Sequence, residues 1–155
     1  MSLIHDTFVI ERSYPKSPAT VFDAFADPAK KRLWYAESRN HTVEEYSSDF
    51  RVDGEERFQY RFREGTPFPG VAITSAGVYE EIIPGGRIIM ASRMALGGNL
   101  ISVTLVTFEF LPSDTGTTLV CTHQAAFSEQ SDGPERREAG WQTLFDNLSN
   151  YLEHV

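Results

Sequence analysis

The apolar pattern at the C-terminal end of the chain predicts a long amphipathic helix. Upstream of the pattern, Asp132 as N-cap residue and Glu135 three positions later form a capping box, with Pro134 inside the first turn. We therefore expect one helix over 133–152, about 30 Å long at 1.5 Å per residue. Its apolar residues recur at the i, i+3, i+4, i+7 spacing of one helix face. They are Trp141, Leu144, Phe145, Leu148, Tyr151, Leu152 and Val155.

The N-terminal part of the chain predicts one strand followed by two short helices. Residues 7–14 are rich in apolar and β-branched types, which favours a strand. Ser17 and Asp27 are each followed by proline, the usual pattern of an N-cap and a first helical residue. Short helices with large apolar residues need a sheet to pack against. Those residues are Val21, Phe22 and Phe25 on one face of the first helix, and Leu33, Trp34 and Tyr35 as a cluster closing the second.

From residue 41 to 127, alternating runs separated by Gly, Pro, Asp and Ser turns predict antiparallel strands. The clearest run is RFQYRFR, in which Phe58, Tyr60 and Phe62 point to one side and the polar residues to the other. One face of this strand is therefore expected to be buried and the other wet.

Two hairpins follow from the same alternation. Segment 71–83 is expected to pair with 87–96 across Pro-Gly-Gly, and segment 100–110 with 117–127 across the turn LPSDTG. We expect six or seven strands in all. The residues assigned to the inner face of the last pair are Thr104, Val106, Phe108, Phe110, Leu119, Cys121, His123, Ala125 and Phe127.

Length and composition bound the class of protein. A chain of 155 residues fits one domain over 1–155, with a core that needs no disulfide or metal. No apolar run approaches the roughly twenty residues of a membrane helix, and no secretory-signal pattern opens the chain, so a cytoplasmic location is expected. The net charge of −8 argues against binding to nucleic acid or an anionic membrane. The single cysteine, Cys121, is expected to be a small buried hydrophobe.

The order of these elements resembles the α+β helix-grip fold, in which a curved antiparallel sheet wraps round a terminal helix. Over residues 8–152 the chain is similar to the START-like superfamily (SRPBCC, pollen-allergen-like). Within it, the chain resembles the family homologous to the C-terminal domain of the activator of the ninety-kilodalton heat-shock chaperone's ATPase. Two places depart from that family: Trp34-Tyr35 replaces a Trp-Trp pair, and Asp53-Gly54 replaces two glycines. The segments that carry the resemblance are SPATVFDAFADPAKKRLWY, FRVDGE, GVYEEIIPGGRII, GTTLVCTH and GWQTLFDNLSNYL.

This resemblance implies a cavity between the long helix and the sheet that takes an apolar small molecule, such as a lipid or an aromatic or polyketide-like compound. The alternative is that the same side chains fill a closed core, because protein interiors are normally close-packed. Gly140 is expected either to allow a strand or a ligand to approach the helix or to be a glycine that the helix merely tolerates. The predicted ligand-binding residues are Trp34, Tyr60, Phe62, Tyr79, Met90, His123, Trp141 and Phe145.

Few polar residues are candidates for chemistry. His123 falls on the inner side of its strand, where it could contact a ligand or act as a base; the usual alternative is a histidine paired within the core. Glu80 and Glu81 face opposite ways, so only one carboxylate can point inward, where it would need Arg93 or another group as its partner. Tyr79 is the remaining polar candidate for chemistry. The histidines expected in solvent are His5, His41 and His154.

The sequence shows no metal-ligand spacing, no phosphate-binding glycine loop and no nucleophile with a base, so no catalytic residue, metal or cofactor is predicted. Two functions agree with the sequence: a binding module for an apolar small molecule, and a cyclase- or aromatase-type enzyme that uses the same cavity. The missing catalytic set favours binding. A third alternative is a protein-binding module like the chaperone activator. Because this chain lacks the activator's separate N-terminal domain, we expect no chaperone partner, whereas a homodimer stays compatible with the sequence.

Overall fold

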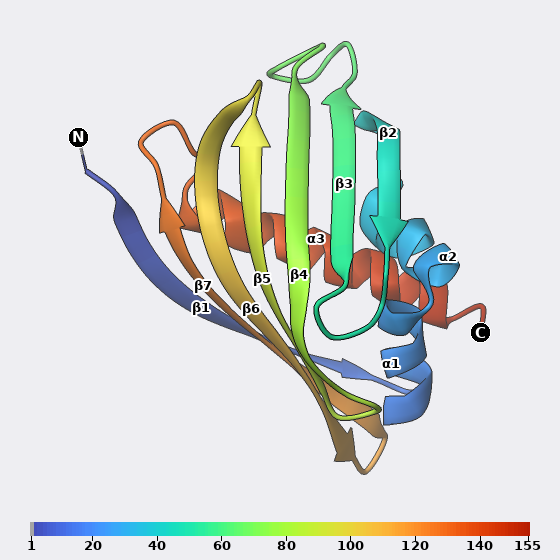
Figure 1. The fold of residues 1–155 in the computed structure, drawn as a ribbon. Helices are drawn as coiled ribbons and strands as arrows, with labels where there is room; N and C mark the ends of the chain where they lie inside the picture. The colour runs from blue at the N-terminus through green and yellow to red at the C-terminus, as the bar shows by residue number, and fades with distance from the viewer. Residues whose placement is uncertain (1) are drawn as a thin grey trace.

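Alternation with a period of two builds a curved, seven-stranded antiparallel sheet within residues 2–155, the part of the chain that this computed structural model describes (Figure 1). The strand order is β1-β7-β6-β5-β4-β3-β2, so the first strand pairs with the last. The expected α+β helix-grip architecture is confirmed. The strands are β1 Ile4–Tyr14, β2 His41–Ser48, β3 Glu55–Phe62, β4 Ala72–Ile83, β5 Arg87–Leu96, β6 Asn99–Ser113 and β7 Gly116–Phe127.

Two short helices follow β1, as the sequence predicts: α1 (Pro18–Ala26) and α2 (Pro28–Lys31), which continues as the π-helical turn η1 (Arg32–Ala36). Both N-caps are confirmed. The Ser17 hydroxyl accepts from the amide of Thr20 at 3.2 Å, and the Asp27 carboxylate accepts from that of Ala29 at 2.9 Å.

The apolar cluster predicted at the end of these helices is only partly formed. Trp34 is fully buried and donates its indole N–H to the Ala24 carbonyl at 2.9 Å, with the Tyr35 ring beside it. Leu33, in contrast, is 55% exposed. Its inclusion in the cluster was wrong, because consecutive residues of a helical turn point in different directions.

The long C-terminal helix α3 (Pro134–Leu152) lies along one face of the sheet and confirms the predicted 133–152 segment (Figure 1). Its expected capping box does not form. Gly133, with φ of 84°, is the N-cap, and no side chain caps the helix. The Asp132 carboxylate accepts hydrogen bonds from Arg137 instead, and this ion pair takes it away from the helix amides.

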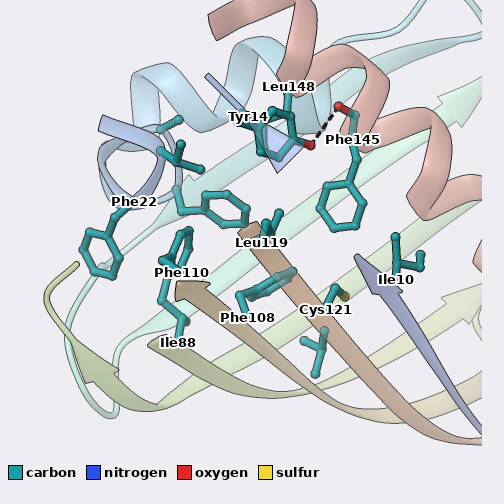
Figure 2. Close-up of a cluster of buried hydrophobic side chains, with 14 of the residues drawn as sticks. Ile10, Tyr14, Phe22, Ile88, Phe108, Phe110, Leu119, Cys121, Phe145 and Leu148 are labelled. Atoms are coloured by element: carbon teal, nitrogen blue, oxygen red, sulfur yellow. Dashed lines mark hydrogen bonds between the residues drawn. The ribbon is translucent and has the colours of Figure 1, made fainter. Parts of the chain in front are cut away.

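The core lies between α3, α1 and the inner face of the sheet (Figure 2). Phe25 of α1 packs against Phe108 and Phe110 of β6, with ring centroids 5.1 and 5.0 Å apart. Phe145 and Leu148 of α3 are fully buried against the same sheet. Burying each such side chain stabilises the fold by about 1.5–3 kcal/mol. The inner-face assignment of β6 and β7 is confirmed, with Ala125 only half-buried.

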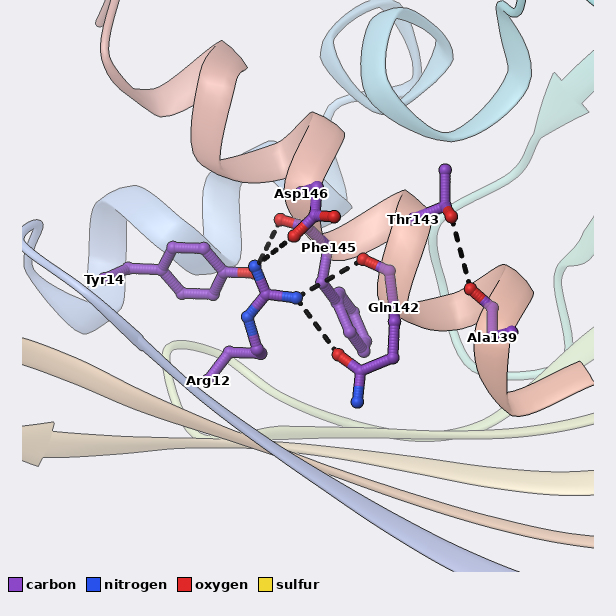
Figure 3. Close-up of polar contacts among 7 residues, drawn as sticks. All are labelled: Arg12, Tyr14, Ala139, Gln142, Thr143, Phe145 and Asp146. Carbon is purple, nitrogen blue, oxygen red and sulfur yellow. Dashed lines mark hydrogen bonds and ion pairs between the residues drawn. The ribbon is translucent and has the colours of Figure 1, made fainter. Parts of the chain in front are cut away.

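Polar bonds from β1 fix the middle of α3 on the sheet. Arg12 donates to the Gln142 side chain at 3.1 Å and to the Asp146 carboxylate at 2.6 Å (Figure 3). The Tyr14 hydroxyl donates to the Phe145 carbonyl at 3.1 Å (Figure 2). The first strand and the last helix therefore hold each other in place.

No helix among residues 2–155 combines the length and the apolar character needed to cross a membrane. In the same residues, no group of three or more His, Cys, Asp or Glu side chains is placed to share a metal ion.

Candidate functional site

Two adjoining hollows lie beside the N-terminal half of α3, with volumes of about 240 and 190 Å³. They share Tyr60, Met94, Asp132 and Arg136 in their walls, so we treat them together as the α3 groove. The first hollow is also lined by Tyr35, His41, Phe58, Arg137, Gly140, Trp141 and Leu144, and the second by Phe62, Phe68, Ile73, Leu96, Ile101, Gln130 and Ser131.

Aromatic rings form one wall of the α3 groove. Alternation along β3 puts Phe58 and Tyr60 on the same side, with centroids 4.8 Å apart. The Tyr35 ring of η1 lies 5.5 Å from Phe58 and 6.1 Å from Trp141 of α3. Three separate elements thus contribute to one row of rings. Such a wall suits a flat or apolar molecule, since ligand pockets are mostly apolar with few polar groups.

The structure divides the eight predicted ligand-binding residues into two sets. Tyr60, Phe62 and Trp141 line the α3 groove. The remaining five lie in the packed core, each at most 4% exposed. The apolar periodicity indicates which side a residue faces but not how deep it lies. The five core residues are Trp34, Tyr79, Met90, His123 and Phe145.

His123 is a core residue without a complete set of hydrogen bonds. Its ring is 1% exposed and stacks on Phe8, with centroids 4.4 Å apart and planes 8° apart. Nδ1 finds no hydrogen-bond partner within residues 2–155, so the expectation of a paired core histidine is wrong at this atom. Burial, with the nearby Arg137 guanidinium, lowers the pKa of His123 to about 4. The imidazole is therefore neutral at neutral pH.

The charged residues of the groove are not equivalent. The buried Arg137 guanidinium donates to both carboxylate oxygens of Asp132, at 2.9 and 2.8 Å, and to the Ser102 hydroxyl at 3.0 Å. Burial acts to raise the pKa of Asp132, but the bonds from Arg137 hold it below its usual value. Asp132 and Arg137 thus neutralise each other. Arg136 is exposed, lines both hollows and makes no ion pair or hydrogen bond among the described side chains.

His41, expected in solvent, belongs to the groove wall. Its Nε2 lies 2.6 Å from the Ala36 carbonyl, and its ring packs 4.2 Å from that of Tyr60. Burial lowers its pKa, and the nearby Arg63 acts in the same direction. The expectation was wrong because the end of η1 supplies a hydrogen-bond acceptor at the start of β2.

A buried ion pair that the sequence pattern does not predict lies next to the Tyr35 ring. Lys31 Nζ and the Glu56 carboxylate are 2.6 Å apart, and the two residues are only 3% and 6% exposed. The Tyr46 hydroxyl donates to Glu56 at 2.8 Å, and Lys31 Nζ lies 4.6 Å from the centre of the Tyr35 ring. Alternation along β3 already places Glu56 on the same face as Phe58. The charged partner on α2 had no such signal.

The carboxylates predicted for the interior do not reach it. The pairing of β4 with β5 shifts register between Tyr79 and Glu81, and the intervening Glu80 is exposed. Glu81 pairs with Arg87, which lowers the pKa of that carboxyl. Arg93, its expected partner, is exposed on the outer face. The prediction of an inward carboxylate paired with Arg93 was wrong because the register shift changes the alternation at this point.

A wider depression of about 540 Å³ lies on the outer face of the sheet, beside Val103 and Leu105. Both side chains are exposed, and the helices within residues 2–155 lie on the other face of the sheet (Figure 1). The α3 groove has walls from both helix and sheet, and is therefore the better candidate for enclosing a ligand.

Comparison with known proteins gives consistent matches. The family model for Activator of Hsp90 ATPase homolog 1-like protein matches residues 15–153. An uncharacterised protein from Rhizobium leguminosarum is 34% identical, with a TM-score of 0.91 over 99% of this chain and 98% of that one. A Rhizobium loti protein, Mll3558, is 39% identical, with a TM-score of 0.85 over 97% and 99%.

More distant likeness supports the fold alone. The AHSA1-like protein from Aeromonas hydrophila is 20% identical and has a TM-score of 0.67, with 96% of this chain and 93% of that chain covered. No curated protein sequence gives a significant match. The family and the fold thus come from the family model and the solved structures.

Proposed function

Because the chain belongs to the Activator of Hsp90 ATPase homolog 1-like family, we propose that it binds an apolar small molecule, of lipid, aromatic or polyketide-like chemistry, in the α3 groove. The observation that carries this proposal is the row of rings, Tyr35, Phe58, Tyr60 and Trp141, along the wall of the first hollow. Each hollow is smaller than the roughly 300–1,000 Å³ of typical ligand pockets, but joined they reach that range.

The groove's polar groups support binding rather than a cyclase-type reaction. They include His41, which is bonded to a backbone carbonyl, and Asp132, which is bonded to Arg137. The bonds from Arg137 make the Asp132 carboxylate a weak base, and the bond to Ala36 leaves only one ring nitrogen of His41 for proton exchange with a substrate. Binding, in contrast, requires only an apolar wall for the body of the ligand and one polar group to orient it, and the groove provides both.

The two tryptophans give a direct test. Trp141 lines the groove, whereas Trp34 is fully buried. We expect naphthalene derivatives and medium-chain lipids to bind, as measured by calorimetry, and to change tryptophan emission. In Trp141→Phe the remaining Trp34 emission should respond little to the same ligands.

An unchanged ligand response in Trp141→Phe would place the ligand elsewhere. Absence of binding across the whole panel would overturn the proposal. Val103→Ala serves as the matched control, because Val103 is an exposed residue on the outer face and should leave binding unaltered.

A further inference from the structure

The groove-facing side of α3 carries positive charge and no unpaired carboxylate. Successive residues turn by about 100° around a helix, so positions i, i+1, i+4, i+5 and i+8 form one stripe. Glu135 and Glu138 fall outside that stripe and do not line either hollow. The stripe that lines the groove consists of Arg136, Arg137, Gly140, Trp141 and Leu144.

Arg136 is the unbalanced charge of this stripe. Arg137 is neutralised by Asp132, the acidic residue in the lining of both hollows. Elsewhere in the described chain, some arginines, such as Arg12 and Arg61, have carboxylate partners, and others, such as Arg93, have none, but these lie outside the lining of the two hollows. Arg136 has none there, although the protein carries a net charge of −8. The groove therefore presents one cation beside its aromatic wall.

Resting on the function proposed above, we infer that the ligand of the α3 groove is an apolar monocarboxylate whose carboxylate pairs with Arg136. The guanidinium presents two parallel N–H donors, which match the two oxygens of a carboxylate. The apolar body would then lie against Tyr60 and Trp141, which share the groove with Arg136. Arg63, close enough to lower the pKa of His41, adds positive potential at the same wall.

The test compares acids with neutral ligands of the same shape: 2-naphthoate with 2-naphthamide, and decanoate with decanamide. In calorimetric titrations at low salt, we expect each acid to bind about two- to fivefold tighter than its amide, the range that a solvent-exposed ion pair provides. Arg136→Gln should remove that difference by weakening the acid alone. Arg136→Lys keeps the charge but loses the two parallel N–H donors. Its affinity for the acid should lie between those of the unaltered protein and Arg136→Gln.

Arg93→Gln is the matched control, since Arg93 is an exposed arginine on the outer face and makes no ion pair within residues 2–155. Its titrations should equal those of the unaltered protein. Because Arg136 is exposed, its variants should have the same thermal unfolding midpoint as the unaltered protein. A lower midpoint would reveal a variant that does not fold properly.

The outcomes separate the two proposals. Equal affinity for acid and amide, or an acid affinity that Arg136→Gln does not change, overturns the carboxylate inference and leaves apolar binding in place. If neither acids nor amides bind, the proposed function fails and the inference fails with it.

Discussion

At the scale of single residues, His123 is buried and its Nδ1 atom has no hydrogen-bond partner within residues 2–155, and this burial lowers the pKa of its ring. The ring lies flat on Phe8, and Nδ1 has no partner among residues 2–155. The folded protein therefore resists protonating this ring, and its pKa falls to about 4 from the ordinary 6.5. In the unfolded chain the same histidine takes up a proton near its ordinary pKa.

This difference predicts an acid-sensitive stability. Because the pKa is lower in the folded state, the contribution of His123 is complete above pH 6.5 and is lost as pH falls towards about 4. His123→Leu should lack this loss, which we expect to be roughly 2–3 kcal/mol between pH 7 and 4. At pH 7 the variant should be close to neutral in stability, since Nδ1 has no bond to lose. Urea unfolding at several pH values measures both effects, and parallel pH profiles would contradict the assignment.

At the scale of elements, Gly140 is an unusual residue in the middle of α3. A side-chain carbon placed there would meet no heavy atom within 4 Å, although the residue lines the groove. The expected close approach of a strand is thus wrong, because no strand atom uses the space. The close approach of a ligand stays a prediction.

Gly140→Ala should stabilise the protein by about 0.5–1 kcal/mol, the difference in helix propensity between the two residues. Ala139→Gly, at the neighbouring exposed position, should lower stability by a similar amount and is the matched control. Denaturant unfolding gives both values. If Gly140→Ala also weakens ligand binding, the ligand uses the space that glycine leaves; a loss of stability instead would show that the backbone there needs glycine.

The sequence predicts the helices and strands better than it predicts how deeply each side chain is buried. The stripe from Trp141 to Leu152 predicts α3 because helix and stripe share one period. The same periodicity cannot tell Trp141, at the groove, from Phe145, in the core. Lys31 was missed because its partner, Glu56, lies on a strand that only the tertiary fold brings near. Local patterns therefore predict faces, and long-range packing decides depth and pairing.

At the scale of the whole molecule, the first strand, β1, and the last helix, α3, lie against each other. Along β1, Ile4 to Tyr14 pair with β7, while Arg12 and Tyr14 bond to α3 (Figure 3). If either β1 or α3 detached from the sheet, the core that both elements cover would be exposed to solvent. We therefore expect residues 2–155 to unfold as one unit.

Cooperative unfolding should appear as a single transition. Far-UV circular dichroism, which follows the sheet and helices, and tryptophan emission from Trp34 and Trp141 should give the same denaturant midpoint. The two tryptophans lie on different elements, η1 and α3, so they report on separate parts of the core. Separate midpoints would show that the chain contains two independently unfolding parts.

The pairing of β1 with β7 also constrains how the chain is made. Tyr14 pairs with Thr117, so about one hundred residues must leave the ribosome before the first strand meets β7, its neighbour in the sheet. At about 5–20 residues per second, β1 waits on the order of 5–20 s with its apolar side uncovered. Every nascent copy therefore exposes Phe8 and Ile10 to chaperones, proteases and other chains until β7 emerges. Translation speed, rather than the stability of the finished fold, sets the length of that exposure.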